Sequence, residues 1–343
     1  MPAYEIRAAL PADEDELLAV ARHLNTVNLP HDRGAIHDLL AVSQKSFSEE
    51  LPPSRREYVF ALRDLSTGRV IGTSMVLGQL GRRDAPYIYF DVLDEEKYSA
   101  SVDKHFHHTV LRIGYSYNGP TEIGGLILLP EYRRVPERLG QFLSYVRFLF
   151  IAGHRPCFRD EVLAELLPPL EADGTSHLWE ALGRHFTHLS YAEADVLSKK
   201  NKEFIKQLFP EGTIYASVLS KDAQDVIGKV GLQTRGVEKM LRRIGFRYAH
   251  RVDPFDGGPH FTAATDEVTL VANSRRSGIG ALGGHGTLKK KGLVAIESHG
   301  APFFRAVLGG LEHPTEGGVV IESDIANYFG LHLGEEVLSL PLD

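Results

Sequence analysis

A basic loop lies between two apolar segments near the middle of the chain. Residues 122–129 form a short apolar run typical of a buried strand, and apolar residues recur at helical spacing from Leu139 onward. Arg133, Arg134 and Arg138 lie between these segments. Because a helix N-terminus offers unpaired N–H groups and partial positive charge, this pattern favours a phosphate-binding loop. A solvated basic turn that only joins a buried strand to a helix is the alternative.

Three carboxylates are candidates for work on an amine or a cation. Glu122 begins the apolar run, where a base could reach an amine through water, and a surface ion pair is the alternative. Asp256 lies in the turn 255–259 (FDGGP), where it could bind a cationic substrate or hold its own backbone as an Asx turn. Asp225 could pair with a guanidinium or simply face solvent on its helix.

The histidines and the cysteine favour simpler roles. His105, His107 and His108 have a spacing seen among metal ligands, but we find no acidic or cysteine partner at a recognisable distance. We therefore interpret them as a solvated polar stretch and expect no metal. Cys157 has no obvious base partner, so we expect a free buried thiol rather than a nucleophile.

Hydrophobic periodicity and turn residues predict a mixture of strands and helices up to residue 260. The expected strands are 4–9, 58–63, 69–77, 87–94, 110–115, 122–129, 161–170, 213–219 and 246–252. The expected helices are one opened by a capping box of Asp13 and Glu16, then 35–50, a helix from 139, 177–186, 191–209, 221–230 and 237–244. A helix, a glycine, an aromatic residue and a strand follow one another at 177–186 and at 239–248, which hints at a duplicated half.

The texture of the chain changes after residue 260. Short strands separated by glycine-rich turns predict a small, barrel-like all-β unit. These strands are expected at 267–272, 293–297, 303–307, 318–322 and 336–340. Residues 275–291 are rich in glycine and basic residues, and we expect a mobile loop there rather than a phosphate site.

Composition bounds the class of protein. A chain of 343 residues exceeds one ordinary core, so two or three subdomains are expected. A net charge of −7 argues against general nucleic-acid binding, and a single cysteine excludes a disulfide framework. No apolar run is long enough for a membrane span, and the first residues lack a signal-peptide pattern, so the expected location is the cytoplasm, away from membranes.

An ordered series of short segments resembles the arginine N-succinyltransferase family. The resemblance is densest from Glu122 to Pro259 and loose after residue 260. The segments that carry it are Ile6-Arg7 with Asp13, Glu50-Leu51-Pro52, Tyr58-Val59-Phe60, Glu122-x-x-x-Leu126, Arg133 through Arg147-Phe148, Trp179-x-x-Leu182-Gly183-x-x-Phe186, Gln224-Asp225-Val226-Ile227-Gly228, Gln233-Thr234 and Gly245-Phe246-Arg247-Tyr248 followed by Phe255-Asp256-Gly257-Gly258-Pro259.

The resemblance implies a fold and a reaction. The implied fold is α+β, with a GNAT-like acyltransferase core of mixed, mostly antiparallel sheet flanked by helices. The implied enzyme transfers succinyl from succinyl-CoA to the α-amine of L-arginine in arginine catabolism. Direct attack by the amine is expected because no activated nucleophile is visible. A backbone N–H on the central strand would stabilise the charge that develops on the thioester oxygen.

The resemblance also implies a domain organisation and a set of site residues. We expect an acyl-CoA-binding domain at 1–190, a second GNAT-like half completing the acceptor site at 191–260, and the all-β unit at 261–343. A homodimer is expected on resemblance alone. Glu122 is the expected base; the expected CoA-binding residues are Leu126, Ile127, Leu128, Arg133, Arg134, Arg138 and Gly140; the expected substrate-binding residues are Asp225, Gln233 and Asp256.

Two departures from the family pattern keep other functions open. The family's proton-donating histidine falls at Gly231, which cannot transfer protons. The pyrophosphate loop is two residues longer than the family's and contains Pro136, which has no N–H. The alternatives are a transferase with another acyl group or amine acceptor, and a non-catalytic relative that binds CoA or an amino acid.

Overall fold

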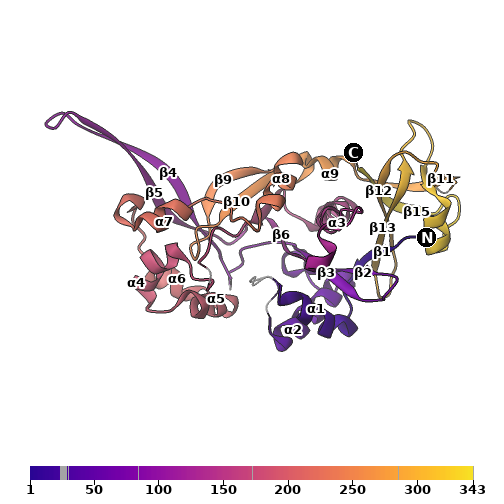
Figure 1. Cartoon of the computed structure of the whole chain (residues 1–343), viewed down its shortest axis with the longest axis horizontal. Coiled ribbons are helices and arrows are strands. Elements are labelled where there is room, and N and C mark those ends of the chain that lie inside the picture. Colours follow the sequence, from indigo (N-terminus) through magenta and orange to yellow (C-terminus); the bar gives the residue numbers. More distant parts are fainter. Residues whose placement is uncertain (24–28, 30, 84, 172, 285, 343) are drawn as a thin grey trace. The chain divides into compact units, whose positions relative to one another are not determined.

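The computed structural model describes residues 1–23, 29, 31–83, 85–171, 173–284 and 286–342. The chain forms two compact units, each assembled from separate stretches of sequence (Figure 1). The first unit comprises Met1–Gln79, Thr121–Asp160 and Ala264–Asp343, and the second comprises Leu80–Pro120 and Glu161–Ala263. The three domains expected from the sequence stay a prediction.

The N-terminal part of the first unit is an antiparallel sheet with helices. Its strands pair in the order β1–β2–β3–β6, each antiparallel to the next. The strands are β1 (Tyr4–Ala8), β2 (Glu57–Asp64), β3 (Val70–Leu77) and β6 (Thr121–Leu128). The α-helices are α1 (Glu14–Ala21), α2 (Arg33–Phe47) and α3 (Leu139–Gly153), with short 3-10 turns at Pro11–Asp13, Pro53–Arg55, Pro130–Tyr132 and Arg155–Cys157. These elements confirm the predicted strands and helices of this part.

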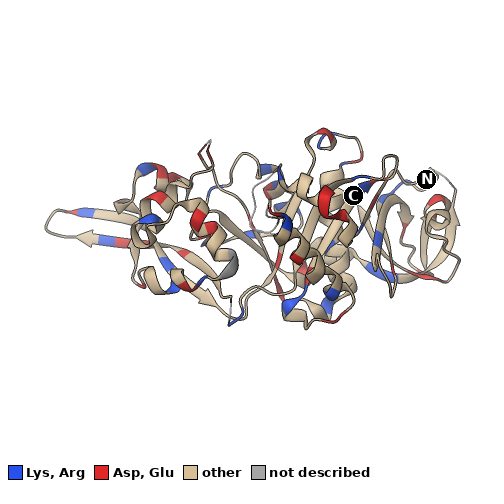
Figure 2. Ribbon diagram, turned by 90° about the horizontal axis from the view of Figure 1, so that it is seen from below, with Lys and Arg blue, Asp and Glu red and all other residues tan. Residues whose placement is uncertain are grey.

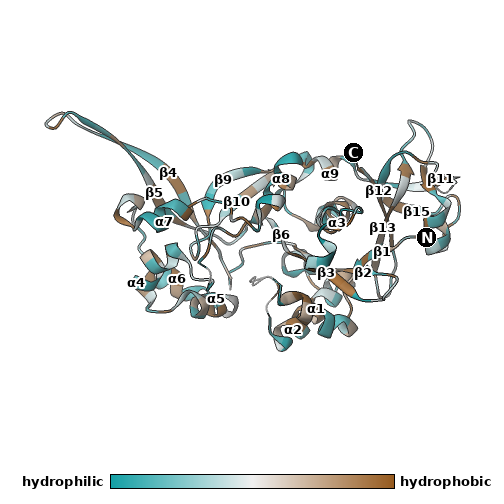
Figure 3. Ribbon diagram, viewed as in Figure 1, coloured by the Kyte–Doolittle hydropathy of each residue, from teal (hydrophilic) through white to brown (hydrophobic). Residues whose placement is uncertain are grey.

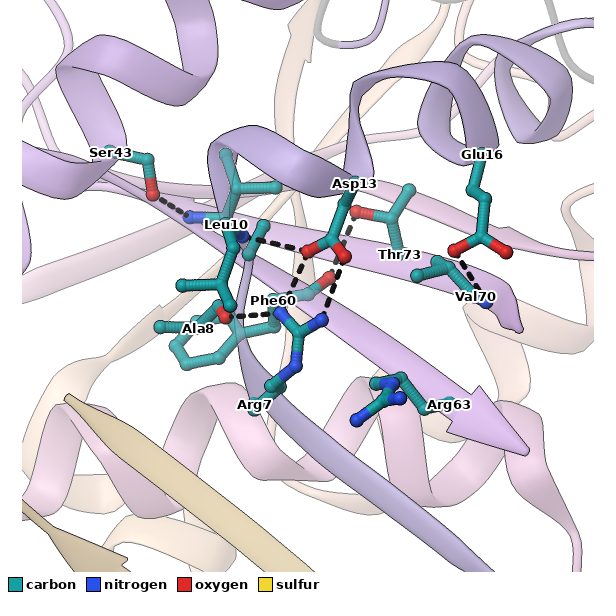
Figure 4. Close-up of polar contacts among 12 residues, drawn as sticks. Arg7, Ala8, Leu10, Asp13, Glu16, Ser43, Phe60, Arg63, Val70 and Thr73 are labelled. Atoms are coloured by element: carbon teal, nitrogen blue, oxygen red, sulfur yellow. Dashed lines mark hydrogen bonds and ion pairs between the residues drawn. The ribbon is translucent and has the colours of Figure 1, made fainter. Parts of the chain in front are cut away.

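The expected capping box before α1 is wrong. No side chain caps α1 at Asp13. The Asp13 carboxylate instead accepts two hydrogen bonds of 2.7 Å from the guanidinium of Arg7 and one of 2.7 Å from the N–H of Leu10 (Figure 4). Glu16 accepts from the N–H of Val70. The Asp13 carboxylate thus neutralises a buried guanidinium, and that of Glu16 binds the backbone of β3. For Asp13 the reason is that a buried guanidinium without a counter-charge would cost more free energy than an uncapped helix end.

The C-terminal part of the first unit contains the predicted barrel. The strands pair around a closed ring in the order β12–β15–β11–β14–β13 and back to β12. Apolar side chains fill it, among them Ile279, Val294 and Val307. The strands are β11 (Arg275–Gly283), β12 (Lys291–Glu297), β13 (Phe304–Glu312), β14 (Val319–Glu322) and β15 (Glu336–Leu342); the helices are α9 (Thr269–Asn273) and α10 (Ser323–Phe329), after a 3-10 turn at Thr265–Glu267. The all-β expectation is confirmed for the strands of the barrel.

Two expectations for this part are wrong. Residues 267–272 form the end of a 3-10 turn and α9 rather than a strand. Most of the expected loop 275–291 is strand β11, which pairs with β14 and β15. Its glycines allow close strand approach, since a Cβ on Gly280 would lie 2.9 Å from the backbone of Gly318. Glycine content here reflects backbone packing, which composition alone did not reveal.

The second unit is built on a sheet with the strand order β7–β10–β9–β4–β5–β8. Its core includes Trp179, whose ring stacks on Phe255 at 5.0 Å between centroids. The strands are β4 (Tyr87–Ser99), β5 (Lys104–Ser116), β7 (Glu161–Glu165), β8 (Ile214–Tyr215), β9 (Arg247–Val252) and β10 (Pro259–Ala264). The helices are a π-helical turn at Trp179–Gly183, α4 (Arg184–Thr187), α5 (Tyr191–Lys200), α6 (Glu203–Leu208), a 3-10 turn at Ala216–Val218, α7 (Lys221–Val226) and α8 (Arg235–Arg243).

Several elements of this unit are shorter than predicted. Strand β7 ends at Glu165, ahead of Pro168 and Pro169, which have no N–H for a sheet ladder. The predicted helix 191–209 is two helices, α5 and α6. Gly183 lets the π-helical turn close on Trp179, because a Cβ there would lie 2.3 Å from the indole ring.

A long hairpin extends from the second unit. Strands β4 and β5 pair from Tyr87 opposite Ser116 to Ser99 opposite Lys104. The sequence predicted only 87–94 and 110–115 as strands, because the distal half lacks apolar alternation. Figure 1 shows the hairpin as a projecting arm, and Figures 2 and 3 show that it carries charged, hydrophilic residues. Backbone pairing thus continues where neither face is buried.

Among the described residues, no helix combines the length and the apolar character that a membrane crossing needs. The fold class expected from the sequence is confirmed as α+β, with a mostly antiparallel sheet and a small C-terminal barrel.

Candidate functional site

Strand β6 of the first unit contains a β-bulge at Gly125 and Leu126. Thr73 of β3 lies opposite Ile127 and Met75 lies opposite Gly124, so two residues of β6 face the single residue between them on β3. Gly125 has φ 55°, in the left-handed region that favours glycine. A bulge removes backbone groups from the regular ladder, and such a group can stabilise a developing oxyanion.

Helix α3 begins just beyond this strand with an open N-terminus. Arg138 precedes the helix in a left-handed conformation, φ 53° and ψ 48°, and its side chain does not cap it. Within the described residues, the N–H groups of Leu139 and Gly140 have no hydrogen-bond partner. Apart from its chain neighbours and the backbone of its own helix, no described heavy atom lies within 4 Å of where a Cβ on Gly140 would be. The helix end therefore has two donors and open space beside them, as an anion site requires.

The three loop arginines differ in what they contact. Arg133 donates from Nε to the carbonyl oxygen of Leu128 at 2.9 Å, which fastens the loop to the end of β6. Arg134 and Arg138 are exposed and form no ion pair with any described residue. Both guanidinium groups are therefore available to an anion at the helix end, whereas that of Arg133 is partly committed to the backbone.

The remaining expected residues of β6 are mostly buried. Leu126 is half-buried, whereas Ile127 and Leu128 are buried and can offer only backbone groups to a ligand. Glu122 lies opposite Leu77 and is 5% exposed. Its carboxylate therefore does not lie at the surface. This argues against the surface ion pair that was the alternative to a role as a base.

A turn in the second unit gathers two carboxylates, of which Asp256 is buried and Asp253 is half-buried. Asp253 accepts hydrogen bonds from the N–H groups of Phe255 at 2.7 Å and Asp256 at 3.3 Å. Asp256 accepts from the N–H of Gly258 at 2.7 Å, which is the Asx turn considered from the sequence. Neither carboxylate forms an ion pair with a described residue. Backbone N–H groups thus hold the two carboxyl groups close together in this turn.

The electrostatics of this turn follow from burial. Desolvation raises the pKa of Asp253 and, with the neighbouring Asp253 charge, raises the pKa of Asp256 well above its usual range. Lys202 and the backbone hydrogen bonds partly oppose the shift at Asp253. The hydroxyl of Tyr191 also has a raised pKa, through burial and the charge of Asp256. A cation binding here would relieve the repulsion between these groups.

His260 follows this turn directly and lies in the interior of the second unit. The Tyr87 hydroxyl is 2.6 Å from its Nδ1, and Oε1 of Glu165 is 3.5 Å from its Nε2. Burial lowers the pKa of His260 to about 3, so the ring is neutral near pH 7. Its Nε2 is buried and has no hydrogen-bond partner among the described residues. Glu165, Asp253 and His260 offer donor atoms within 4.8 Å of one another, which suits a cation.

The sequence analysis missed this histidine. The available signal was its place immediately after residues 255–259, the most family-like turn of the chain. Glu165 and Tyr87 could not have been found this way, because they come from β7 and β4, far from His260 in sequence. Only the folded unit brings the three together.

Comparison with known proteins identifies the family of this chain. Residues 4–270 match the family model described as Arginine N-succinyltransferase beta subunit. The chain belongs to the arginine N-succinyltransferase family. It is 34% identical over 275 residues to the arginine N-succinyltransferase subunit beta of Pseudomonas aeruginosa, covering 79% of both chains. It is 33% identical over 273 residues to the arginine N-succinyltransferase of Escherichia coli, covering 79% of this chain and 78% of that protein.

A solved structure shows the same fold. The arginine/ornithine succinyltransferase subunit AI from Pseudomonas aeruginosa matches with a TM-score of 0.83 at 24% sequence identity. The match covers 99% of each chain, so the fold of this arginine N-succinyltransferase family member is shared from end to end, including the barrel that resembled the family only loosely in sequence.

Gly231, where the sequence resemblance puts the family's histidine, has no room for a side chain. A Cβ on Gly231 would lie 2.6 Å from the carbonyl oxygen of Pro168 and 3.0 Å from that of Leu167. The N–H of Gly231 also donates to the Leu167 oxygen at 2.8 Å. The departure is therefore built into the packing of the second unit and is more than a change of side chain.

The other two expected acceptor residues lie at the surface of the second unit. Asp225 forms an exposed ion pair with Lys221 at 2.6 Å, the solvent-facing arrangement considered from the sequence. It also lines a pocket of about 530 Å³ together with Glu238 and Tyr248. Gln233 is exposed and has no side-chain hydrogen bond with a described residue.

The hairpin histidines do have an acidic neighbour. The pairing of β4 with β5 places Glu96 opposite His107, and its oxygens lie 3.4 Å from nitrogens of His105 and His107. The expectation of no acidic partner is therefore wrong, because that partner comes from the other strand. All three side chains are exposed.

Proposed function

We propose that this protein transfers the succinyl group of succinyl-CoA to the α-amine of L-arginine, as part of arginine catabolism. The observation that carries this proposal is the family match over residues 4–270. The named relatives are arginine N-succinyltransferases at 33–34% identity. The charge distribution of the two units supports it, because one offers donors for an anion and the other offers carboxylates for a cation.

The first unit is the proposed acyl-CoA side. Arg134, Arg138 and the N–H groups at Leu139 and Gly140 would hold the pyrophosphate, with charge and donors together at one helix end. The backbone at Leu126, in the bulge, would donate to the thioester oxygen, while the neighbouring strand backbone aligns the pantetheine. Arg133 would act mainly by holding the loop in place.

The second unit is the proposed acceptor side. Asp253, Asp256 and Glu165 would bind the cationic acceptor, since a guanidinium prefers carboxylates with which it can form charge-assisted hydrogen bonds. His260 would accept or donate a hydrogen bond at its otherwise unpartnered Nε2. Asp225 and Gln233 remain part of the proposed acceptor side.

The proposed chemistry is direct aminolysis of the thioester. The amine loses a proton to Glu122, through water, and its lone pair attacks the thioester carbon. The carbon–nitrogen bond forms and the carbon–sulfur bond breaks. The second proton, which the nitrogen releases after the attack, passes through water to the departing thiolate, so CoA leaves as a thiol. A missing general acid at Gly231 would typically slow the reaction by about 10²–10⁴-fold and need not abolish it.

Thiol release from succinyl-CoA, measured with and without L-arginine, tests the proposal. Acetyl-CoA serves as the comparison donor, and ornithine and lysine as comparison acceptors. Arginine-dependent release with succinyl-CoA is the expected result. Preference for another donor or acceptor would reassign the substrates, and binding of CoA or arginine by folded protein without turnover would favour a non-catalytic relative. The cytoplasmic location, the homodimer and the three domains remain predictions.

A further inference from the structure

Arg147 is a buried guanidinium without an anion. It lies on α3 and is 2% exposed. Its three nitrogens donate to the carbonyl oxygen of Ser144 at 3.0 Å, to the Ser144 hydroxyl at 2.8 Å and to the carbonyl oxygen of Gly124 at 3.4 Å. Among the described residues it forms no ion pair. Neutral oxygens alone surround this charge.

The same unit shows how the fold treats a buried arginine that serves structure. Arg7 is 6% exposed and forms a two-pronged ion pair with Asp13 at 2.7 Å (Figure 4). A buried charge without a partner is costly, because its hydration is lost and nothing replaces it. Burial accordingly lowers the pKa of Arg147 to about 9. An anion from outside the chain would supply what Asp13 supplies to Arg7.

Arg147 lies level with the bulge of β6. Its hydrogen bond to Gly124 places it one residue before Gly125, where the bulge begins. The sheet neighbours agree, since a Cβ on Gly72 of β3 would lie 3.0 Å from Leu143, one helical turn before Arg147. Ser74 lies two residues after Gly72 on β3, so both residues belong to the same face of the sheet.

Ser74 adds a second unsatisfied group at this place. Its side chain is 0% exposed, and its hydroxyl has no hydrogen-bond partner among the described residues. It lies between Thr73 and Met75, directly opposite the extra residue of the bulge. A buried hydroxyl without a partner costs stability unless a ligand completes it.

We propose that Arg147 and Ser74 bind the terminal carboxylate of the acyl group and so select succinyl-CoA over acyl-CoAs with neutral tails. The inference rests on the proposed function, because it assumes that the thioester lies at the bulge. In succinyl the carboxylate carbon is three carbon–carbon bonds, about 4 Å, beyond the thioester carbon. The carboxylate of a succinyl group bound at the bulge can therefore reach only side chains that lie close to the bulge. Arg147 would donate two hydrogen bonds to the carboxylate and Ser74 one.

The wild-type protein provides the first test. Butyryl-CoA has the same chain length as succinyl-CoA but ends in a methyl group. Titration of each acyl-CoA without acceptor should give a dissociation constant for succinyl-CoA at least about 10-fold lower than for butyryl-CoA. Equal constants would overturn the inference while leaving acyl transfer open. A clear preference without any turnover would instead keep the inference and count against the proposed reaction.

Variants show which residues cause the preference for succinyl-CoA over butyryl-CoA. Arg147→Met should raise the dissociation constant for succinyl-CoA by about 100-fold and change that for butyryl-CoA little. Arg147→Lys should restore part of the preference, and Ser74→Ala should weaken it less than Arg147→Met does. Arg56→Met, which removes another buried arginine of the first unit, should leave the ratio unchanged. An equal loss for both acyl-CoAs in Arg147→Met would assign Arg147 a structural role, and if that variant does not fold, Arg147→Lys and Ser74→Ala decide.

Discussion

The two units leave opposite charges unpaired. In the first unit these are the buried guanidinium of Arg147 and the exposed ones of Arg134 and Arg138. In the second unit they are the carboxylates of Asp253 and Asp256, which are held by backbone N–H groups and have no ion pair among the described residues. Succinyl-CoA is an anion and arginine carries a cationic side chain, so the unpaired charge of each unit has the sign that one proposed substrate needs.

The difference teaches where to look for binding groups in such a fold. A buried charge that serves structure is paired within the chain, as Arg7 is with Asp13. Leaving a buried charge unpaired costs stability and is therefore expected only where a ligand completes it. Variants and pH series of the two units can test this contrast between paired and unpaired charges.

Removing Arg7 should destabilise the first unit far more than removing Arg147. Arg7→Met leaves Asp13 buried without its partner, which should cost about 3–5 kcal/mol. Arg147→Met leaves no carboxylate unpaired and should cost clearly less. Denaturant unfolding of the two variants measures the difference, with Arg7→Met/Asp13→Leu as a control that should recover part of the loss. Equal losses would remove the distinction between a structural and a ligand-binding arginine.

Neutralising the turn of the second unit should weaken acceptor binding. Asp256→Asn keeps the oxygen that accepts from Gly258, so the Asx turn is preserved while the charge is lost. The KM for arginine should rise by about 30-fold or more. The KM for succinyl-CoA should stay the same, and Asp222→Asn, at an exposed position on α7, should change neither. A rise in both KM values would point to a general structural defect.

Neutralising the loop arginines should weaken CoA binding. Replacing both Arg134 and Arg138 by glutamine removes two charges near the helix N-terminus, which should raise the KM for succinyl-CoA by about 10-fold. The remaining affinity should depend less on salt, because fewer exposed charges contribute. Arg69→Gln, at another exposed arginine of the first unit, is the matched control. If KM and its salt dependence match those of the control, the pyrophosphate lies elsewhere.

Asp253 and Asp256 should make the stability of the protein depend on pH. Their pKa values are raised by folding, so the folded protein holds protons that the unfolded chain releases. Their favourable contribution is complete below the ordinary value of 3.8 and is lost as the pH rises through the raised pKa values. Asp253→Asn/Asp256→Asn should therefore gain stability relative to wild type as the pH is raised. If the stabilities of the two proteins change with pH in the same way, folding does not raise the pKa values of these carboxyl groups.

The binding of arginine should depend on pH in the opposite direction from stability, becoming stronger as the pH rises. Arginine requires the charged carboxylates, so its dissociation constant in wild type should rise as the pH falls through the raised pKa values. Saturating arginine should also lower these pKa values, because it stabilises the charged form. Calorimetric titration over a pH series, with the double asparagine variant as control, measures both.

The amino-acid sequence was sufficient to predict the family, the strand–loop–helix around Arg133–Arg138 and the position of the barrel. These depend on local features: apolar periodicity, turn residues, and the order of short motifs along the chain. Asp256 could be singled out for the same reason, since its turn is encoded in neighbouring residues.

Which charges are paired became clear only from the folded structure. Asp13 looked like a helix cap and proved to be the partner of Arg7, while Arg147 looked like any residue of an apolar helix. The glycine-rich stretch after Arg275 became strand β11 because partners distant in sequence pair with it, and Gly231 is fixed by the backbone of Pro168. His260 likewise meets Tyr87 and Glu165 only after folding. Pairing, burial and close approach are properties of distant neighbours, and a single sequence does not state which neighbours those are.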